Sequence, residues 1–186
     1  MYAKNNSVYI EKGFMDFESF YRRIEELDQQ INLTNHAIVI HFRISTSGKI
    51  DKENCHPYPI TNNLRYTRCT LLKCNDVAFC HNGIIRDYIP TGQKLYNDTQ
   101  MFDAQVLSFF KSKYPEFYKS KNIMKMLDIL CKSKLCFLDN KGDIYTVGNF
   151  MERDGILYSN LKFLPTKSEP KIFDDWDTLY DMEWIY

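Results

Sequence analysis

The chain has 186 residues, of which 44% are hydrophobic and 15% aromatic, and its formal net charge is zero. These values are typical of one soluble globular domain, and no apolar run approaches the roughly 18 residues of a membrane span. Residues 1–6 lack the apolar core of a signal peptide, so we expect a cytoplasmic protein whose six cysteines stay reduced. Abundant Lys, Asn, Ile and Tyr are typical of an AT-rich bacterial or phage genome.

The N-terminal third contains two strand patterns and one helix pattern. Residues 7–13 alternate and end in glycine, which predicts a strand. Apolar residues recur at three- and four-residue spacing over 17–31, which predicts an amphipathic helix with Asp16 as its N-cap. Residues 37–45 form a nearly continuous apolar run, as expected of a strand buried on both faces, and residues 46–59 read as a loop.

The remaining body alternates in the same way between strands and helices. The patterns predict a hairpin of residues 70–73 and 77–81 around Asn75-Asp76, and a helix that starts at Asp98-Thr99 and continues through Phe110. A second helix is predicted at 118–131, a second hairpin at 135–138 with 144–147, and a last strand at 156–159. Strands, a helix pair and strands again favour a layered α+β fold.

A C-terminal tail differs from the body in charge. We divide the chain into a domain at 1–163 and an acidic, aromatic tail at 164–186. Residues 169–186 contain six acids against one lysine, which leaves 23 basic and 18 acidic residues for the rest. The tail aromatics, including Phe173, Trp176 and Trp184, either cap the body or dock on a basic protein surface that normally holds nucleic acid. We expect neither a membrane nor a directly bound nucleic acid as partner.

Arg43 lies within the apolar run with His41, and a buried guanidinium is costly without an anionic partner. A structural ion pair would satisfy it. A small ligand's carboxylate would also satisfy it, because the planar guanidinium matches a carboxylate bidentately.

Asn82-Gly83 follows a predicted strand, and an asparagine amide with a glycine N–H can point two donors at a developing oxyanion. The same dipeptide is a common turn. Asp98 is equally ambiguous, since it suits a helix N-cap.

Taken in order, several short motifs resemble a class II glutamine amidotransferase domain: His41-Phe42-Arg43-Ile44-Ser45-Thr46, His56-Pro57, His81-Asn82-Gly83-Ile84-Ile85, Asn97-Asp98-Thr99 and Leu157-Tyr158-Ser159-Asn160. The match covers roughly residues 1–163. The family implies an N-terminal-nucleophile hydrolase fold, with stacked antiparallel sheets between outer helix layers. Here the first strand of that fold is missing.

The resemblance also implies roles for individual residues. Arg43 would bind the α-carboxylate of glutamine and Asp98 its α-ammonium, while Asn82 and Gly83 would form the oxyanion hole. Thr46 and His56 would line or brace the pocket. One fixed cation and one fixed anion suit a zwitterion.

The family's nucleophile is a cysteine at position one, whose α-amine acts as general base, but position one here is Met1. Two hypotheses follow. The chain is either a non-catalytic amidotransferase-like protein that acts as a binding or inhibitor module, for instance a phage protein directed at a host complex, or an active amidotransferase whose nucleophile strand is absent. We favour the first.

Two other chemistries were weighed for the cysteines and histidines. A zinc site built from Cys55, His56, Cys80 and His81 would lack the usual Cys-x-x-Cys spacing, and no Asn or Asp completes a papain-like pair. We therefore expect neither a metal nor another cofactor.

Overall fold

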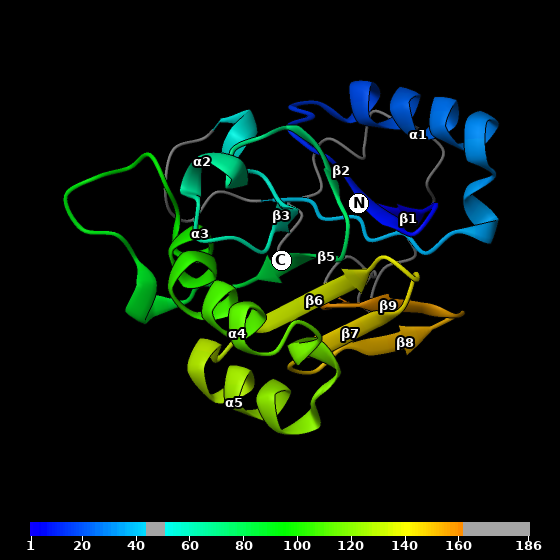
Figure 1. Cartoon of the computed structure of the whole chain (residues 1–186). Coiled ribbons are helices and arrows are strands. Elements are labelled where there is room, and N and C mark those ends of the chain that lie inside the picture. The colour runs from blue at the N-terminus through cyan, green and yellow to red at the C-terminus, as the bar shows by residue number, and fades with distance from the viewer. Residues whose placement is uncertain (44–50, 162–186) are drawn as a thin grey trace, which may run out of the picture.

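The computed structural model describes residues 1–43 and 51–161. Two antiparallel sheets organise this part of the chain (Figure 1). The first has the order β1-β2-β4, formed by Tyr2–Lys4, Ser7–Glu11 and Leu71–Cys74. The second has the order β3-β5-β6-β7, formed by Tyr58–Pro59, Val77–Asn82, Lys134–Asp139 and Ile144–Val147. A separate hairpin pairs β8 (Met151–Arg153) with β9 (Ile156–Tyr158).

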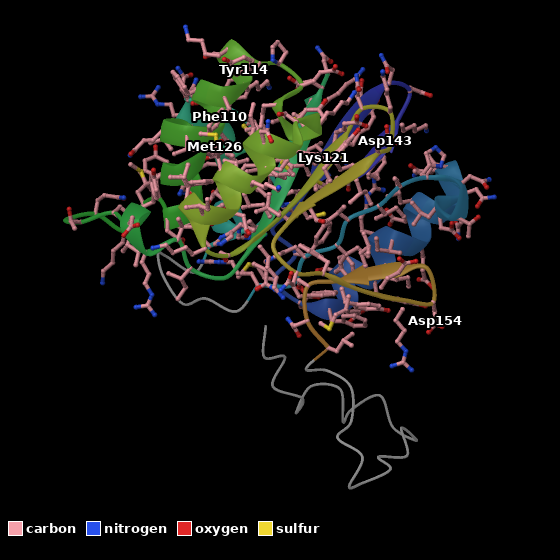
Figure 2. The ribbon with its side chains drawn as sticks, turned by 90° about the horizontal axis from the view of Figure 1, so that it is seen from below. Phe110, Tyr114, Lys121, Met126, Asp143 and Asp154 are labelled. Atoms are coloured by element: carbon pink, nitrogen blue, oxygen red, sulfur yellow. The ribbon has the colours of Figure 1, made fainter. Side chains whose placement is uncertain are left out.

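The helices lie beside these sheets. Their bounds are α1 Phe17–Ile31, α2 Leu64–Thr67, α3 Asp98–Phe102, a π-helical segment Asp103–Leu107, α4 Ser108–Lys113 and α5 Lys121–Cys131. Short 3-10 turns occupy Leu33–Asn35, Lys52–Asn54, Arg86–Tyr88 and Phe117–Lys119. Figure 2 shows α4 and α5, which carry Phe110 and Met126, on the opposite side of the molecule from the hairpin tip at Asp154. The fold is therefore α+β, as the sequence predicts.

Strand alternation creates two cores. On β5, Val77 and Phe79 face one cluster, which the helices α3 to α5 complete with Phe102 and Leu127. The intervening Ala78 and Cys80 face a second cluster, shared with β1, β2 and β4. Successive side chains of a strand point to opposite faces, so β5 belongs to both cores. The two sheets thus pack face to face, and α3 to α5 cover the outer face of the second.

Several predicted elements are confirmed. The strand at 7–13, the helices at 17–31 and 118–131, the hairpin at 135–147 and the strand at 156–159 all occur, with ends that differ by up to three residues. Asp16 caps α1, since its carboxylate accepts the Ser19 N–H at 2.7 Å. All six cysteines are free thiols.

The predicted hairpin at 70–81 is wrong. β4 pairs with β2 and β5 pairs with β3 and β6, so the turn at Asn75-Asp76 carries the chain from one sheet to the other. The two strands occur where the sequence predicts them, but they belong to different sheets. Their side chains meet in the core between the sheets, and the strands are not hydrogen-bonded to each other.

The predicted strand at 37–45 is also wrong in its burial. In the described part, 37–43, only Ile38 forms a β-bridge, to Tyr2, and Ile40 and Phe42 are 51% and 42% exposed. Residues 44 and 45 lie outside the described residues. Among the described residues, this apolar segment pairs with another segment along one edge only. The hydrophobic pattern of the sequence does not show how many edges are paired.

Asp98 is not the cap of α3. Asn97 is, through a capping box in which its side chain accepts the Gln100 N–H and Gln100 reaches back to the Asn97 N–H. Asp98 is instead the first helical residue. The proposed domain boundary after residue 163 and the tail lie outside the described residues.

Candidate functional site

A cavity of about 570 Å³ lies between α1 and residues 38–43. Apolar side chains of α1 form one wall and Met1 with Tyr2 contributes another. In Figure 1, α1 lies above β1 and β2. Four residues with polar side chains gather at one end of the lining: His41, Arg43, Cys55 and His56. Two of the predicted ligand-binding residues, Arg43 and His56, therefore line the same cavity.

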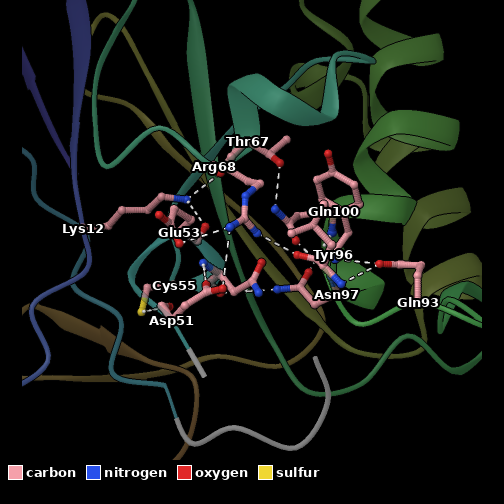
Figure 3. Close-up of polar contacts among 12 residues, drawn as sticks. Lys12, Asp51, Glu53, Cys55, Thr67, Arg68, Gln93, Tyr96, Asn97 and Gln100 are labelled. Atoms are coloured by element: carbon pink, nitrogen blue, oxygen red, sulfur yellow. Dashed lines mark hydrogen bonds and ion pairs between the residues drawn. The ribbon is translucent and has the colours of Figure 1, made fainter. Parts of the chain in front are cut away.

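Lys12 stabilises the loop that carries Cys55 and His56. The Lys12 ammonium donates to the backbone carbonyls of Glu53, at 3.0 Å, and Thr67, at 2.6 Å (Figure 3). It also lies 4.1 Å from the centroid of the Tyr58 ring. Burial lowers the pKa of Lys12 to about 7. In the sequence, this residue is marked only as a lysine at the end of a predicted strand.

A second brace reaches the same loop from the helix at Asn97. The Asn97 amide donates to the Tyr58 hydroxyl at 2.8 Å and to the Asn54 carbonyl at 3.3 Å, while the Tyr58 hydroxyl donates to the same carbonyl at 2.6 Å. Arg68 adds an ion pair to Glu53 at 3.1 Å (Figure 3). These bonds fix the backbone on both sides of His56, whose bond to Pro57 is cis.

Three histidines lie in a row from the cavity into the core. The ring centroids of His41 and His56 are 4.3 Å apart, and those of His56 and His81 are 6.1 Å apart. Burial lowers the pKa values of His41 and His81 to about 4, and lowers the pKa of His56 well below its usual value. The row is therefore neutral at physiological pH. In the sequence, all three residues lie in short motifs, and a pocket role is expected for His56 alone.

His81 is fully engaged at the inner end of this row. Its Nε2 lies 2.9 Å from the Ser133 hydroxyl, and its Nδ1 lies 2.7 Å from the Thr99 hydroxyl. Because Ser133 donates its proton to the Asn82 carbonyl, at 2.8 Å, we assign the His81 proton to Nε2.

His56 differs sharply from His81. It is 8% exposed, yet neither ring nitrogen has a hydrogen-bond partner among residues 1–43 and 51–161. A buried polar group without a partner costs about 1–3 kcal/mol, so such a group in a cavity wall indicates a place for a polar ligand atom. Burial is the main cause of the lowered pKa of His56, and the charges of Lys12 and Arg43 lower it further.

The remaining predicted residues lie behind the histidine row. Asp98 is 4% exposed and its Oδ2 accepts the Ile85 N–H at 2.6 Å. Asp98 and Arg43 both act on the pKa of Tyr58, in opposite directions, so both lie near this ring, although Asp98 does not line the cavity. Thr46 lies outside the described residues.

Asn82 and Gly83 form a tight end to β5. The Asn82 amide donates to the Ser159 hydroxyl at 2.6 Å, which links β5 to the chain just after β9. Gly83 has φ +132°, and a Cβ at this position would lie 2.1 Å from the Ser133 hydroxyl oxygen, so no other residue fits. In this arrangement the Asn82 donor is already used. Oxyanion binding would require Ser159 to give way.

Metal ligation and membrane insertion were also considered. In the described ranges, no group of three or more His, Cys, Asp or Glu side chains is arranged to hold a metal ion. Within the same ranges, every helix is too short or too polar to cross a membrane.

Comparison of the chain with protein-family models, with curated proteins and with solved structures finds no match. The resemblance to class II glutamine amidotransferases therefore rests on the order of the short motifs and on their chemistry.

Proposed function

We propose that this protein is a non-catalytic class II glutamine amidotransferase-like module that binds an amino acid such as glutamine in the cavity beside α1. The proposal includes the layered N-terminal-nucleophile-hydrolase-like architecture. The observation that carries it is the polar end of the cavity, where Arg43 lines the wall next to a buried His56 with unpartnered ring nitrogens.

The chemistry of this end fits a carboxylate. The Arg43 guanidinium can bind a carboxylate bidentately. An amide group of the same ligand would supply the donor and acceptor that the His56 ring can use. The Asp98 carboxylate acts on the pKa of Tyr58, and its negative charge would favour an ammonium group of the ligand.

The thiols of this chain do not suit the chemistry of the family, in which the nucleophilic thiol and the general-base α-amine belong to one residue. The Met1 α-amine donates to the Val39 carbonyl at 2.9 Å. The six thiols are internal, and burial raises the pKa of those in the core, such as Cys80 and Cys136, to about 12. Thiols of this kind are poor nucleophiles at neutral pH.

The second hypothesis remains an active glutamine amidotransferase or amidase whose N-terminal nucleophile strand is absent from this chain. The open cavity beside α1 favours it, since a strand could occupy that space. In the binding hypothesis, the acidic tail at 164–186 would direct the module to a basic surface of a host complex as an inhibitor.

Calorimetry with L-glutamine and L-glutamate tests the binding proposal. We expect both to bind and Arg43→Lys to weaken binding at least about tenfold, because an ammonium cannot form the bidentate contact. Arg22→Lys is the matched control, since Arg22 is an exposed arginine on the outer face of α1. No heat with either ligand, or equal losses in both variants, would contradict the proposal. Ammonia released from glutamine would favour the second hypothesis.

A further inference from the structure

The segment 37–43 has one paired edge and one open edge. Val39 and Met1 exchange two backbone hydrogen bonds of 2.9 Å, and Ala3 N–H donates to the Ala37 carbonyl at 3.1 Å. In an extended chain, alternate residues point their backbone groups to opposite edges. The N–H and C=O groups of Ile38 and Ile40 therefore point away from β1.

Within the described ranges, the backbones of Ile38 and Ile40 form no hydrogen bond, although both residues line the cavity. Unpaired backbone groups at a strand edge are a template for pairing with another chain. Residues 38–43 line the cavity without a break, and α1 lines it as well.

The walls of this space are mainly apolar, and the charged residues of the cavity lining are three acids and two arginines. Phe20, Ile24 and Leu27 of α1 face the cavity, and the Phe20 ring lies 5.2 Å from the Phe42 ring. Glu11 and Arg23 in the lining neutralise each other through contacts of 2.7 and 2.9 Å. We call the part of the cavity bounded by α1 and residues 38–42 the α1 groove.

The charge of the cavity lining and the open backbone edge of residues 37–43 indicate which kind of molecule fits the α1 groove. A small apolar molecule would fill 570 Å³ but would leave the edge groups unsatisfied. The chain's own tail is a poor fit, because residues 169–186 contain six acids and the cavity lining already holds three acidic residues against two arginines. An uncharged extended strand satisfies both the backbone edge and the apolar walls, and it extends the ladder that β1 begins.

We propose that the α1 groove receives an uncharged, apolar β-strand from a partner polypeptide, which pairs with the open edge of Ile38 and Ile40. This goes beyond the proposed amino-acid site, which uses the Arg43 and His56 end of the same cavity. The strand supplies backbone hydrogen bonds to both residues, and its inward side chains cover Ile40 and Phe42, which are half exposed. Main-chain pairing sets the affinity and the groove walls set the side-chain preference.

Fluorescence polarisation with the full chain tests this proposal. The probe is a labelled, amidated peptide with the core Val-Thr-Val-Thr-Val, flanked on each side by Gly-Ser. We expect saturable binding that is lost when the five core amides are N-methylated, since methylation removes the donors and keeps the side chains. Equal binding of the methylated peptide would overturn strand pairing and indicate an ordinary apolar pocket.

Two isoleucine variants provide the matched comparison. Ile40→Lys places a charge on the open edge and should weaken probe binding at least about tenfold. Ile129→Lys alters an isoleucine of α5 that is 71% exposed and remote from the groove, and should leave binding unchanged. Both sites are exposed, so both variants should fold, and urea denaturation verifies this. Equal binding by Ile40→Lys would overturn the proposal.

Three further outcomes would overturn the choice of occupant. The first is tighter binding of a peptide with the sequence of residues 179–186, which would assign the groove to the chain's own tail. The second is a dimer that Ile40→Lys dissociates, which would assign it to a second copy. The third is no probe binding by the wild-type chain. Glutamine binding is measured separately, so failure here leaves the Arg43 test unaffected.

Discussion

The two faces of this molecule are built from equally apolar sequence, yet they are packed very differently. Between the second sheet and α3 to α5, large aromatic side chains such as Phe79, Phe102 and Phe137 are completely buried. Between α1 and residues 38–43, the side chains of Ile40 and Phe42 remain about half exposed around a cavity. Hydrophobic content therefore does not distinguish a finished core from an open groove. The difference is whether a neighbouring element is present to cover each face.

The largest expected difference between the two faces is in the free energy of unfolding. Phe137→Ala should destabilise the protein by about 3–5 kcal/mol, because it leaves a cavity in a closely packed cluster. Phe42→Ala, at a ring that is 42% exposed, should cost less than about 1.5 kcal/mol. Urea denaturation measures both. Similar losses would mean that the groove is packed as tightly as the core.

A second comparison uses pH and the inner end of the histidine row. Burial lowers the pKa of His81 to about 4, below the value of about 6.5 in an unfolded chain. Between these values the unfolded state binds more protons, so stability is complete above pH 6.5 and is lost as pH falls toward 4. At pH 5 this single group should cost about 2 kcal/mol relative to pH 7.

His81→Gln should therefore reduce the loss of stability between pH 7 and pH 5 by that amount, even if it destabilises the protein at both values. His36→Gln is the control, because His36 lies at the surface beside α1. Urea denaturation at the two pH values gives both differences. A pH dependence unaltered by His81→Gln would show that His81 does not remain neutral in the folded protein.

The smallest expected effect compares two helix caps. Asn97 caps α3 from a buried position and also donates to Tyr58, so Asn97→Ala should cost about 2 kcal/mol, at the upper end for a cap. Asp16 caps α1 at the exposed rim of the groove, and Asp16→Ala should cost about 0.5–1 kcal/mol. Thermal unfolding of both variants tests the order. A reversed order would mean that α1 is held as firmly as α3.

The elements with strong periodicity were predictable from the sequence. The spacing over 17–31 and the capping Asp16 identified α1, and alternation around a four-residue turn identified β6 and β7. The partners of β4 and β5 were not predictable, because a strand pattern specifies which side chains share a face but not which sheet accepts the strand. The cap at Asn97 was missed because its neighbour Asp98 has the same propensity.

The candidate site was predictable in part. Arg43 and His56 share a cavity, as the motif order implies, and Gly83 occupies a position that only glycine can adopt. Lys12, Ser133 and Tyr58 were not foreseen as parts of this region, since their contacts bridge as many as 55 residues of sequence. Whether the His56 ring nitrogens have a hydrogen-bond partner among the described residues depends on all the residues that surround the ring, and no local sequence pattern contains that information.

The sequence by itself determined the α+β class, most of the helices and strands, and the residue types that a carboxylate-binding site needs. Tertiary structure decided which strands are neighbours, which histidine keeps its ring nitrogens unsatisfied, and which edge of residues 37–43 stays open. The physical reason is that periodicity records the preference of each side chain for burial, whereas pairing and exposure depend on elements that are distant in the chain.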